Sequence, residues 1–169
     1  MNSEKSNSNC PIRRADRALP REDAERILRE AEYGTLAMCD APGGNGSAPE
    51  PYGVPVSFVF WRGALWFHSA NDGRKFRILS AAPRVHFSCA QNVQAVFTRF
   101  FTTRYESAMV AGTIETVRDD ATKRDALREL CRKYLPEKMS VADEHIDASL
   151  ARTAVFRLVP ETLTAKAKH

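Results

Sequence analysis

The sequence lacks the motifs that mark several large functional classes. Its cysteines, Cys10, Cys39, Cys89 and Cys131, form no CxxC pair and no CxxC…HxxH spacing, which argues against a zinc site and favours four reduced thiols. The sequence also contains no Walker motif, GxGxxG fingerprint or GxSxG elbow. These motifs would indicate a phosphate loop, a dinucleotide fold or a serine hydrolase. We therefore expect no metal site and none of these three chemistries.

A long uninterrupted apolar run is also missing. The longest apolar stretch, residues 54–70, is broken by Pro55, by Arg62 with Gly63, and by His68. A membrane-spanning helix requires ~20 nearly unbroken apolar residues. The first residues, MNSEKSNSNC, contain no apolar core of the kind found in secretory signals. We therefore expect a cytoplasmic protein that makes no membrane contact.

What is present is the composition of an ordinary globular protein. The chain has 169 residues, of which 43% are hydrophobic and 27% are charged. This composition predicts one domain with a core that needs no disulfide. Residues 1–18 are polar and are predicted to form a flexible tail, followed by a single domain over residues 19–169.

The excess of positive charge is small and dispersed. Lys and Arg number 25 against 21 Asp and Glu, for a net charge of +4, and most of the basic residues have acids nearby in the sequence. A nucleic-acid-binding module is an alternative that rests on net charge alone, and we expect no nucleic-acid partner. A small anionic ligand would need only a few of these cations.

Hydrophobic periodicity predicts a mainly β chain with helices at a few crossings. Ala24, Ile27 and Leu28 follow helical spacing after Pro20, whereas alternating apolar residues predict strands. Hairpin links between the strands favour an antiparallel sheet, and a small barrel with attached helices fits the pattern. The expected helices are 20–33, 74–82, 119–135 and 141–150, and the expected strands are 35–39, 54–61, 64–69, 84–90, 100–103, 107–117, 153–159 and 162–165.

The segment FHSANDGRKF, residues 67–76, carries the most informative chemistry. His68 and Ser69 end a strand, a turn with Gly73 follows, and Arg74 and Lys75 begin a helix. The free N–H groups of a helix N-terminus, together with two cations, can hold a phosphate monoester. The alternative is a plain strand-to-helix turn with solvated cations.

Alternation along the strand that ends in His68 predicts where this side chain points. Leu65 and Phe67 share one face of the strand, and Trp66 and His68 share the other. If the barrel core takes Leu65 and Phe67, His68 faces a cleft beside the Gly73 turn. An imidazole there can donate a hydrogen bond to a bound ligand.

The strand YGVPVSFVF, residues 52–60, adds a second feature. Pro55 cannot donate to a sheet ladder, so it indicates a strand edge or a bulge. Peptide groups at such an edge can bond a flat heteroaromatic ring. The alternative is an edge strand that its proline protects against aggregation.

Taken together, these stretches resemble the 5-nitroimidazole-resistance family, within the pyridoxamine 5′-phosphate oxidase-like flavin-binding split barrels. The resemblance runs over residues 14–165 and rests on DRALPREDAERILREAEYGTLA, PYGVPVSFVF, LWFHSANDGRKFRIL, PRVHFS, FTTRYESAMVAGTIETV and RTAVFRL. It implies a mainly β fold with helices, a six-stranded antiparallel Greek-key split β-barrel. Three departures from the family pattern are present. Residues 40–51 are expected to form a loop that is longer and richer in Gly and Pro, Leu150 stands where the family has Trp, and Pro20 stands where it has a Ser or Thr cap.

The resemblance also implies a homodimer with two FMN sites at the subunit interface. The isoalloxazine would lie along Pro55, Val56, Ser57 and Phe58, and the ribityl chain and phosphate along Phe67, His68, Ser69, Ala70 and Lys75. Thr103 and Ser107 would approach from the partner subunit, and His68 would take part in nitroimidazole reduction.

Three functions follow, in order of preference. The first is a cytoplasmic FMN-dependent oxidoreductase that passes electrons from NAD(P)H or another donor to a small organic acceptor, such as a nitroaromatic compound. The second is a non-enzymatic flavin or haem binder of the same fold. The third is the nucleic-acid-binding module.

Overall fold

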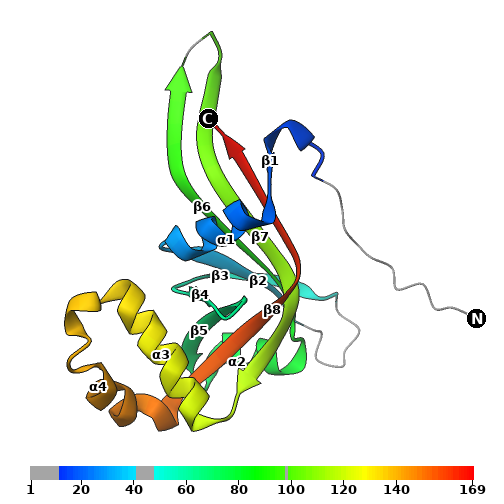
Figure 1. Cartoon of the computed structure of the whole chain (residues 1–169). Coiled ribbons are helices and arrows are strands. Elements are labelled where there is room, and N and C mark those ends of the chain that lie inside the picture. The colour runs from blue at the N-terminus through cyan, green and yellow to red at the C-terminus, as the bar shows by residue number, and fades with distance from the viewer. Residues whose placement is uncertain (1–11, 41–47, 98) are drawn as a thin grey trace, which may run out of the picture.

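A computed structural model describes residues 12–40, 48–97 and 99–169. All strand pairs in it are antiparallel, and they form one sheet in the order β3-β2-β6-β7-β8-β5-β4, with β1 paired to β8 (Figure 1). The spatial order β6-β7-β8-β5 places the first of four consecutive strands beside the last, which is a Greek-key arrangement. The strands are β1 (Ala18–Leu19), β2 (Gly34–Asp40), β3 (Glu50–Val56), β4 (Val59–Trp61), β5 (Ala64–Ala70), β6 (Arg84–Phe97), β7 (Phe101–Val117) and β8 (Thr153–Lys168). The predicted mainly β, antiparallel fold is confirmed.

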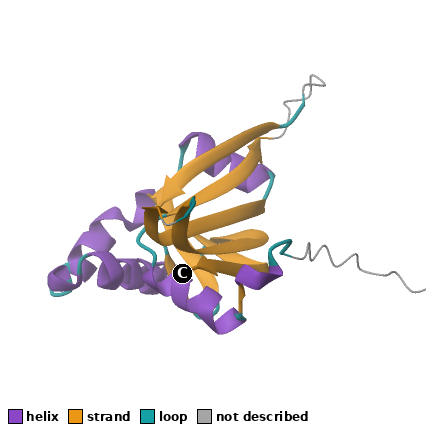
Figure 2. Ribbon diagram, turned by 90° about the horizontal axis from the view of Figure 1, so that it is seen from above, coloured by secondary structure: helices purple, strands orange, loops and turns teal. Residues whose placement is uncertain are grey.

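The helices lie where periodicity predicted them. They are α1 (Arg21–Glu30), α2 (Gly73–Ala81), α3 (Asp120–Tyr134) and α4 (Ala142–Ser149), with short 3-10 helices at Ala15–Arg17, Pro136–Lys138 and Leu150–Arg152. Pro20 occupies the N-cap position of α1 without a side-chain bond, whereas the Asp119 carboxylate caps α3 by accepting from the N–H of Thr122 at 2.7 Å. Figure 2 shows that α3 and α4 gather on one side of the sheet.

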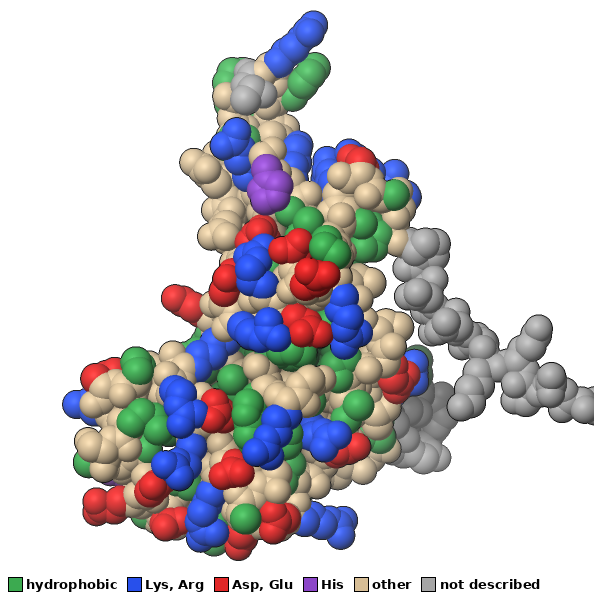
Figure 3. Space-filling model, viewed as in Figure 1, with side chains coloured by type: hydrophobic (Ala, Val, Ile, Leu, Met, Phe, Trp, Pro, Cys, Tyr) green, Lys and Arg blue, Asp and Glu red, His purple; other side chains and the backbone are tan. Residues whose placement is uncertain are grey.

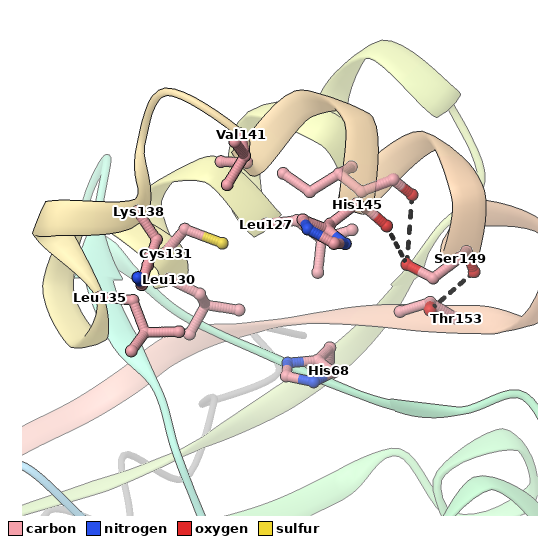
Figure 4. A pocket seen from close by; sticks show the side chains of 12 residues that line it. His68, Leu127, Leu130, Cys131, Leu135, Lys138, Val141, His145, Ser149 and Thr153 are labelled. Atoms are coloured by element: carbon pink, nitrogen blue, oxygen red, sulfur yellow. Dashed lines mark hydrogen bonds between the residues drawn. The ribbon is translucent and has the colours of Figure 1, made fainter.

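Two hydrophobic clusters organise the interior, and β5 lies between them. Leu65 and Phe67 point into the barrel, where Phe67 stacks on Phe156 with ring centroids 5.3 Å apart. Trp66 points the other way, into a cluster that α3 and α4 cover. The predicted alternation along β5 is confirmed, and His68 therefore lies on the side of α3 and α4 (Figure 4).

The predicted strand over 54–61 is divided into two, whereas the expected strands over 153–159 and 162–165 form one continuous strand, β8. β3 pairs with β2, and β4 pairs with β5. The division falls at Ser57 and Phe58, where the Phe58 N–H donates to the Tyr134 hydroxyl at 2.9 Å and not to a neighbouring strand. Beyond it, the turn at Arg62 and Gly63 has φ values of 50° and 72°, as a tight hairpin requires.

The hairpin of β6 and β7 is longer than predicted and projects from the body of the molecule (Figure 1). β6 continues past Ala90 to Phe97, and β7 is continuous where two strands were expected. The register between the two strands shifts between Gln91 and Gln94, and Asn92 has a φ of 53°. A bulge of this kind lets a strand change direction and continue.

Some expectations concern segments that the structure describes only in part. Residues 1–11 of the expected tail and 41–47 of the expected 40–51 loop lie outside the described residues. Ala18 and Leu19 pair with Lys166 and Ala165 of β8, and β3 already begins at Glu50. Among the described residues, no helix is long and apolar enough to cross a membrane.

Candidate functional site

Lys75 lies half-buried in the first turn of α2. Partial removal from water lowers the pKa of its ammonium. In the part of the chain that the structure describes, no hydrogen bond or ion pair involves this group. A half-buried cation without a carboxylate is a site that an external anion can neutralise.

The neighbouring cations of α2 are already neutralised. Arg74 bonds Asp40 at 3.2 Å and Glu50 at 2.7 Å, and its guanidinium lies 4.5 Å from the centre of the Tyr52 ring. Arg77 contacts the same Asp40 carboxylate at 3.1 Å. Of these three cations, only Lys75 has no ion pair among the described residues.

His68 stands beside Lys75, at the end of β5. Partial burial lowers the pKa of the imidazole, and the positive charge of Lys75 lowers it further. The His68 side chain is therefore neutral at pH 7 and can donate or accept a hydrogen bond. Between these residues the chain turns at Gly73, with a φ of 86°, and the Asp72 side chain makes no capping bond to α2. The first N–H groups of the helix thus remain open to an anion.

A groove of about 480 Å³ lies on the outer face of the sheet. Pro55 of β3 and Ser107 of β7 both line it, so the structure brings together two predicted site residues that are far apart in the sequence. The remaining lining residues are uncharged: Tyr33, Gly34, Thr35, Ser88, Cys89, Ala90 and Met109. Burial raises the pKa of the Cys89 thiol to about 11, so it is uncharged at neutral pH.

The remaining predicted site residues lie elsewhere. The side chains of Val56, Phe58 and Phe67 are in the barrel core and face no external ligand. Ser57 is half-buried beyond the end of β3. The other three side chains lie on strands, outside the groove: the Ser69 hydroxyl donates to the Ala70 carbonyl at 2.6 Å, Ala70 pairs with Thr153, and Thr103 pairs with Ala95 along the projecting hairpin.

Glu106, within the TTRYES segment, is a residue whose role the sequence argument missed. Its buried carboxylate accepts from Arg26 of α1 at 2.7 Å, from Gln91 at 2.9 Å and from Asn92 at 3.0 Å. The guanidinium of Arg26 and the two amides lower the pKa of Glu106 to about 2. The acid therefore holds α1 against the β6 bulge. The sequence pattern that could have revealed it is an acid at a position of an alternating strand that faces the interior.

A second missed cluster joins α3 to the division between β3 and β4. The Lys133 ammonium donates to the carbonyls of Ala31 at 2.7 Å and Phe58 at 3.1 Å, and the Tyr134 hydroxyl donates to Glu32 at 2.6 Å. Burial lowers the pKa of Lys133 to about 8. These contacts hold the end of α1 and the Phe58 backbone at fixed positions beneath the groove.

The family model for pyridoxamine 5′-phosphate oxidase matches residues 20–167. The chain belongs to this family. Its fold is accordingly the flavin-binding split barrel. No curated protein matches the sequence.

Solved structures extend the likeness of fold. A candidate 5-nitroimidazole antibiotic resistance protein from Bacteroides thetaiotaomicron is 24% identical with a TM-score of 0.74, over 88% of this chain and 85% of that one. An FAD and haem binding protein from Mycobacterium smegmatis is 22% identical with a TM-score of 0.75, over 89% and 72%. The flavocytochrome Anf3 from Azotobacter vinelandii is 20% identical with a TM-score of 0.77, over 94% and 72%. At these identities the likeness is one of fold.

Proposed function

We propose that the protein binds FMN and uses it to reduce a small organic acceptor. Membership of the pyridoxamine 5′-phosphate oxidase family supports a flavin. The observation that carries the proposal is the half-buried Lys75 ammonium beside His68, at an uncapped helix N-terminus with no carboxylate partner among the described residues. This arrangement fits the dianionic phosphate of FMN.

Each residue has a distinct task in this proposal. Lys75 and the first N–H groups of α2 hold the phosphate, and neutral His68 offers a hydrogen bond to the flavin or the acceptor. Pro55 offers an apolar ring surface, and Ser107 offers a hydroxyl. When bound, the flavin supplies the electron transfer, while the chain orients it and limits the access of water.

We place the flavin at the interface of a homodimer. Support comes from the projecting β6–β7 hairpin, whose Phe97, Phe100 and Phe101 are 68%, 70% and 86% exposed. Figure 3 shows hydrophobic and basic side chains gathered at its tip. Clustered exposed aromatics usually mark a surface that a partner covers. Thr103 lies on this hairpin, so a second subunit could bring it to a flavin site.

A binder without turnover is the second candidate. The FAD and haem binding protein from M. smegmatis and the flavocytochrome Anf3 share this fold. A flavin or haem group held without a reaction would need the same binding residues. The two candidates therefore differ in turnover rather than in architecture.

The visible spectrum of the purified protein is the first test. A yellow protein would indicate bound flavin and a red one bound haem, since each group colours the protein that holds it. Mass analysis of the released ligand separates FMN from FAD. Steady-state oxidation of NADH or NADPH with a nitroimidazole acceptor then tests for an enzyme. A colourless protein that takes up neither flavin nor haem would refute the proposal.

A further inference from the structure

A second cavity, of about 410 Å³, lies between β5, α3 and α4 (Figure 4). Its volume falls within the ~300–1,000 Å³ typical of small-molecule sites. It shares no lining residue with the groove that contains Pro55 and Ser107. Half of its twelve lining residues are aliphatic: Leu127, Leu130, Leu135, Val141, Ala142 and Ile146.

The side chains around this cavity that can carry a positive charge are not balanced by a carboxylate. His68, Lys138 and His145 line it together with the Cys131 thiol, and no Asp or Glu is among its described lining residues. Two of the three acids of α4 are held elsewhere, because Asp143 pairs with Arg128 at 3.2 Å and Asp147 pairs with Arg124 at 2.6 Å. These ion pairs line a separate hollow on another face of the two helices.

The cavity is open to a ligand. Leu135 and Val141 at its lining are 51% and 41% exposed. Figure 4 shows His68 pointing from β5 toward the helices and the Cys131 sulfur pointing into the space between them. The hydroxyls present are already satisfied, since Ser149 donates to His145 and Thr153 donates to Ser149, each at 2.9 Å to the backbone carbonyl. Polar recognition is thus left to the basic side chains.

We propose that this cavity binds a small amphipathic carboxylate, with its apolar body against Leu127, Leu130 and Ile146 and its carboxylate toward Lys138. Apolar walls with a basic group at the opening complement such a ligand in both shape and charge. The cavity adjoins the proposed flavin site at His68, and a ligand can occupy it without flavin.

Calorimetric titration with octanoate, 1-octanol and octylammonium separates the contribution of the ligand's charge to affinity from that of its apolar body. Octanoate should bind ~3–5-fold more tightly than 1-octanol, as a partly exposed ion pair contributes, and octylammonium should bind most weakly. Lys138→Ala should abolish the preference for octanoate and leave octanol binding unchanged. The matched control Arg132→Ala removes the same charge from the exposed end of α3, where Arg132 pairs with Glu129, and should keep the preference.

Protection of Cys131 locates the ligand without a substitution. Octanoate should slow the alkylation of Cys131, which lines the cavity, and leave that of exposed Cys39 unchanged. The proposal is overturned if octanol and octanoate bind equally. It is also overturned if Cys131 is inaccessible before octanoate is added, since another copy of the chain would then cover the cavity. All measurements work with flavin-free protein, so a failure of the flavin proposal leaves this test intact.

Discussion

At the scale of single residues, three cations stand close together at the start of α2, yet their neighbours give them different roles. Arg74 and Arg77 are held by Asp40, and Lys75 is left beside His68. Residue type alone would rank the arginines as the better phosphate ligands, because their planar groups bind phosphate with two bonds. Their ion pairs reverse that order.

Lys75→Ala is expected to weaken FMN binding by roughly 10–150-fold, because a charge-assisted contact contributes ~1.5–3 kcal/mol. Riboflavin, which lacks the phosphate, should bind the variant as it binds the wild type. Fluorescence titration of both ligands measures the difference. Arg77→Ala, which removes an exposed cation paired with Asp40, is the control and should leave FMN affinity unchanged. Equal losses for FMN and riboflavin would mean that Lys75 is structural.

His68→Ala is expected to leave the melting temperature within a few degrees, because a side chain at the edge of a cavity, partly open to solvent, usually contributes less than ~1 kcal/mol. Flavin affinity or nitroimidazole reduction should fall several-fold. His86→Ala, at another exposed strand histidine, serves as the control and should change neither. A His68 variant that unfolds early but keeps normal activity per folded molecule would identify a packing residue.

At the scale of elements, the positions of the long strands depend on a few close contacts between neighbouring elements. Gly112 sits at the register shift between β7 and β8, and a Cβ there would lie 2.0 Å from the Val159 carbonyl oxygen. The register shift at Gly112 therefore has a steric origin. Glu106 likewise fixes α1 against β6, because it accepts hydrogen bonds from Arg26 of α1 and from Gln91 and Asn92 of β6.

Gly112→Ala is expected to lower the free energy of unfolding by about 3 kcal/mol, since backbone must move to admit the methyl group. Gly53→Ala is the matched control within the sheet, because its nearest atom, Thr35 Cγ2, would lie 3.7 Å away in ordinary contact. Urea denaturation of both variants measures the difference. Equal stability of the two would contradict the steric account.

Glu106→Gln is expected to lower the free energy of unfolding by about 2 kcal/mol at pH 7, because it weakens bonds to a buried acid. The folded pKa of about 2 lies below the ordinary 4.5. The stabilisation by Glu106 is therefore complete above pH 4.5 and is lost as the pH falls through about 2.

Denaturation of the wild type and of Glu106→Gln as a function of pH should thus give curves that converge in acid. Glu115→Gln, at an exposed position of the same strand that pairs with Arg157 at 3.5 Å, should cost less than ~1 kcal/mol throughout. A difference between wild type and Glu106→Gln that persists at pH 2 would contradict the assignment.

At the scale of the whole molecule, the β6–β7 hairpin exposes aromatic side chains that nothing in the same chain covers among the described residues. It projects beyond the barrel and ends in exposed aromatics, with Phe97 and Phe101 packed against each other at 4.6 Å (Figure 1). Such a surface gains stability when a partner removes it from water. The proposed dimer would supply that partner.

Sedimentation at micromolar concentration is expected to give twice the chain mass of 18.9 kDa. Phe101→Asp should shift the protein toward monomer, because it places a charge where the partner is expected to bury an aromatic ring. The near-UV circular dichroism of the variant should stay unchanged, which separates dissociation from unfolding. A wild-type monomer that binds flavin tightly would contradict the interface site.

The sequence alone determined most of the local structure. The apolar stripe of Ala24, Ile27 and Leu28 predicted α1, and the alternation of Leu65, Trp66 and Phe67 predicted both the β5 strand and the sides that these residues face. The gap between the expected strands 54–61 and 64–69 also placed the turn at Arg62 and Gly63. These features depend on spacing along the chain, which a single sequence contains.

Tertiary structure decided what depends on residues that are distant in the sequence. Tyr134 divides the strand at Phe58 from 76 positions away, and Asp40 removes Arg74 from the anion site from 34 positions away. The cavity between β5, α3 and α4 likewise exists only because His68 and Lys138 come from separate elements. Periodicity says which face of an element is apolar, but not which partner that face meets. Those tertiary contacts also decide that Lys75 is the cation left without an ion pair among the described residues, because an ion pair requires two side chains that only the fold brings together.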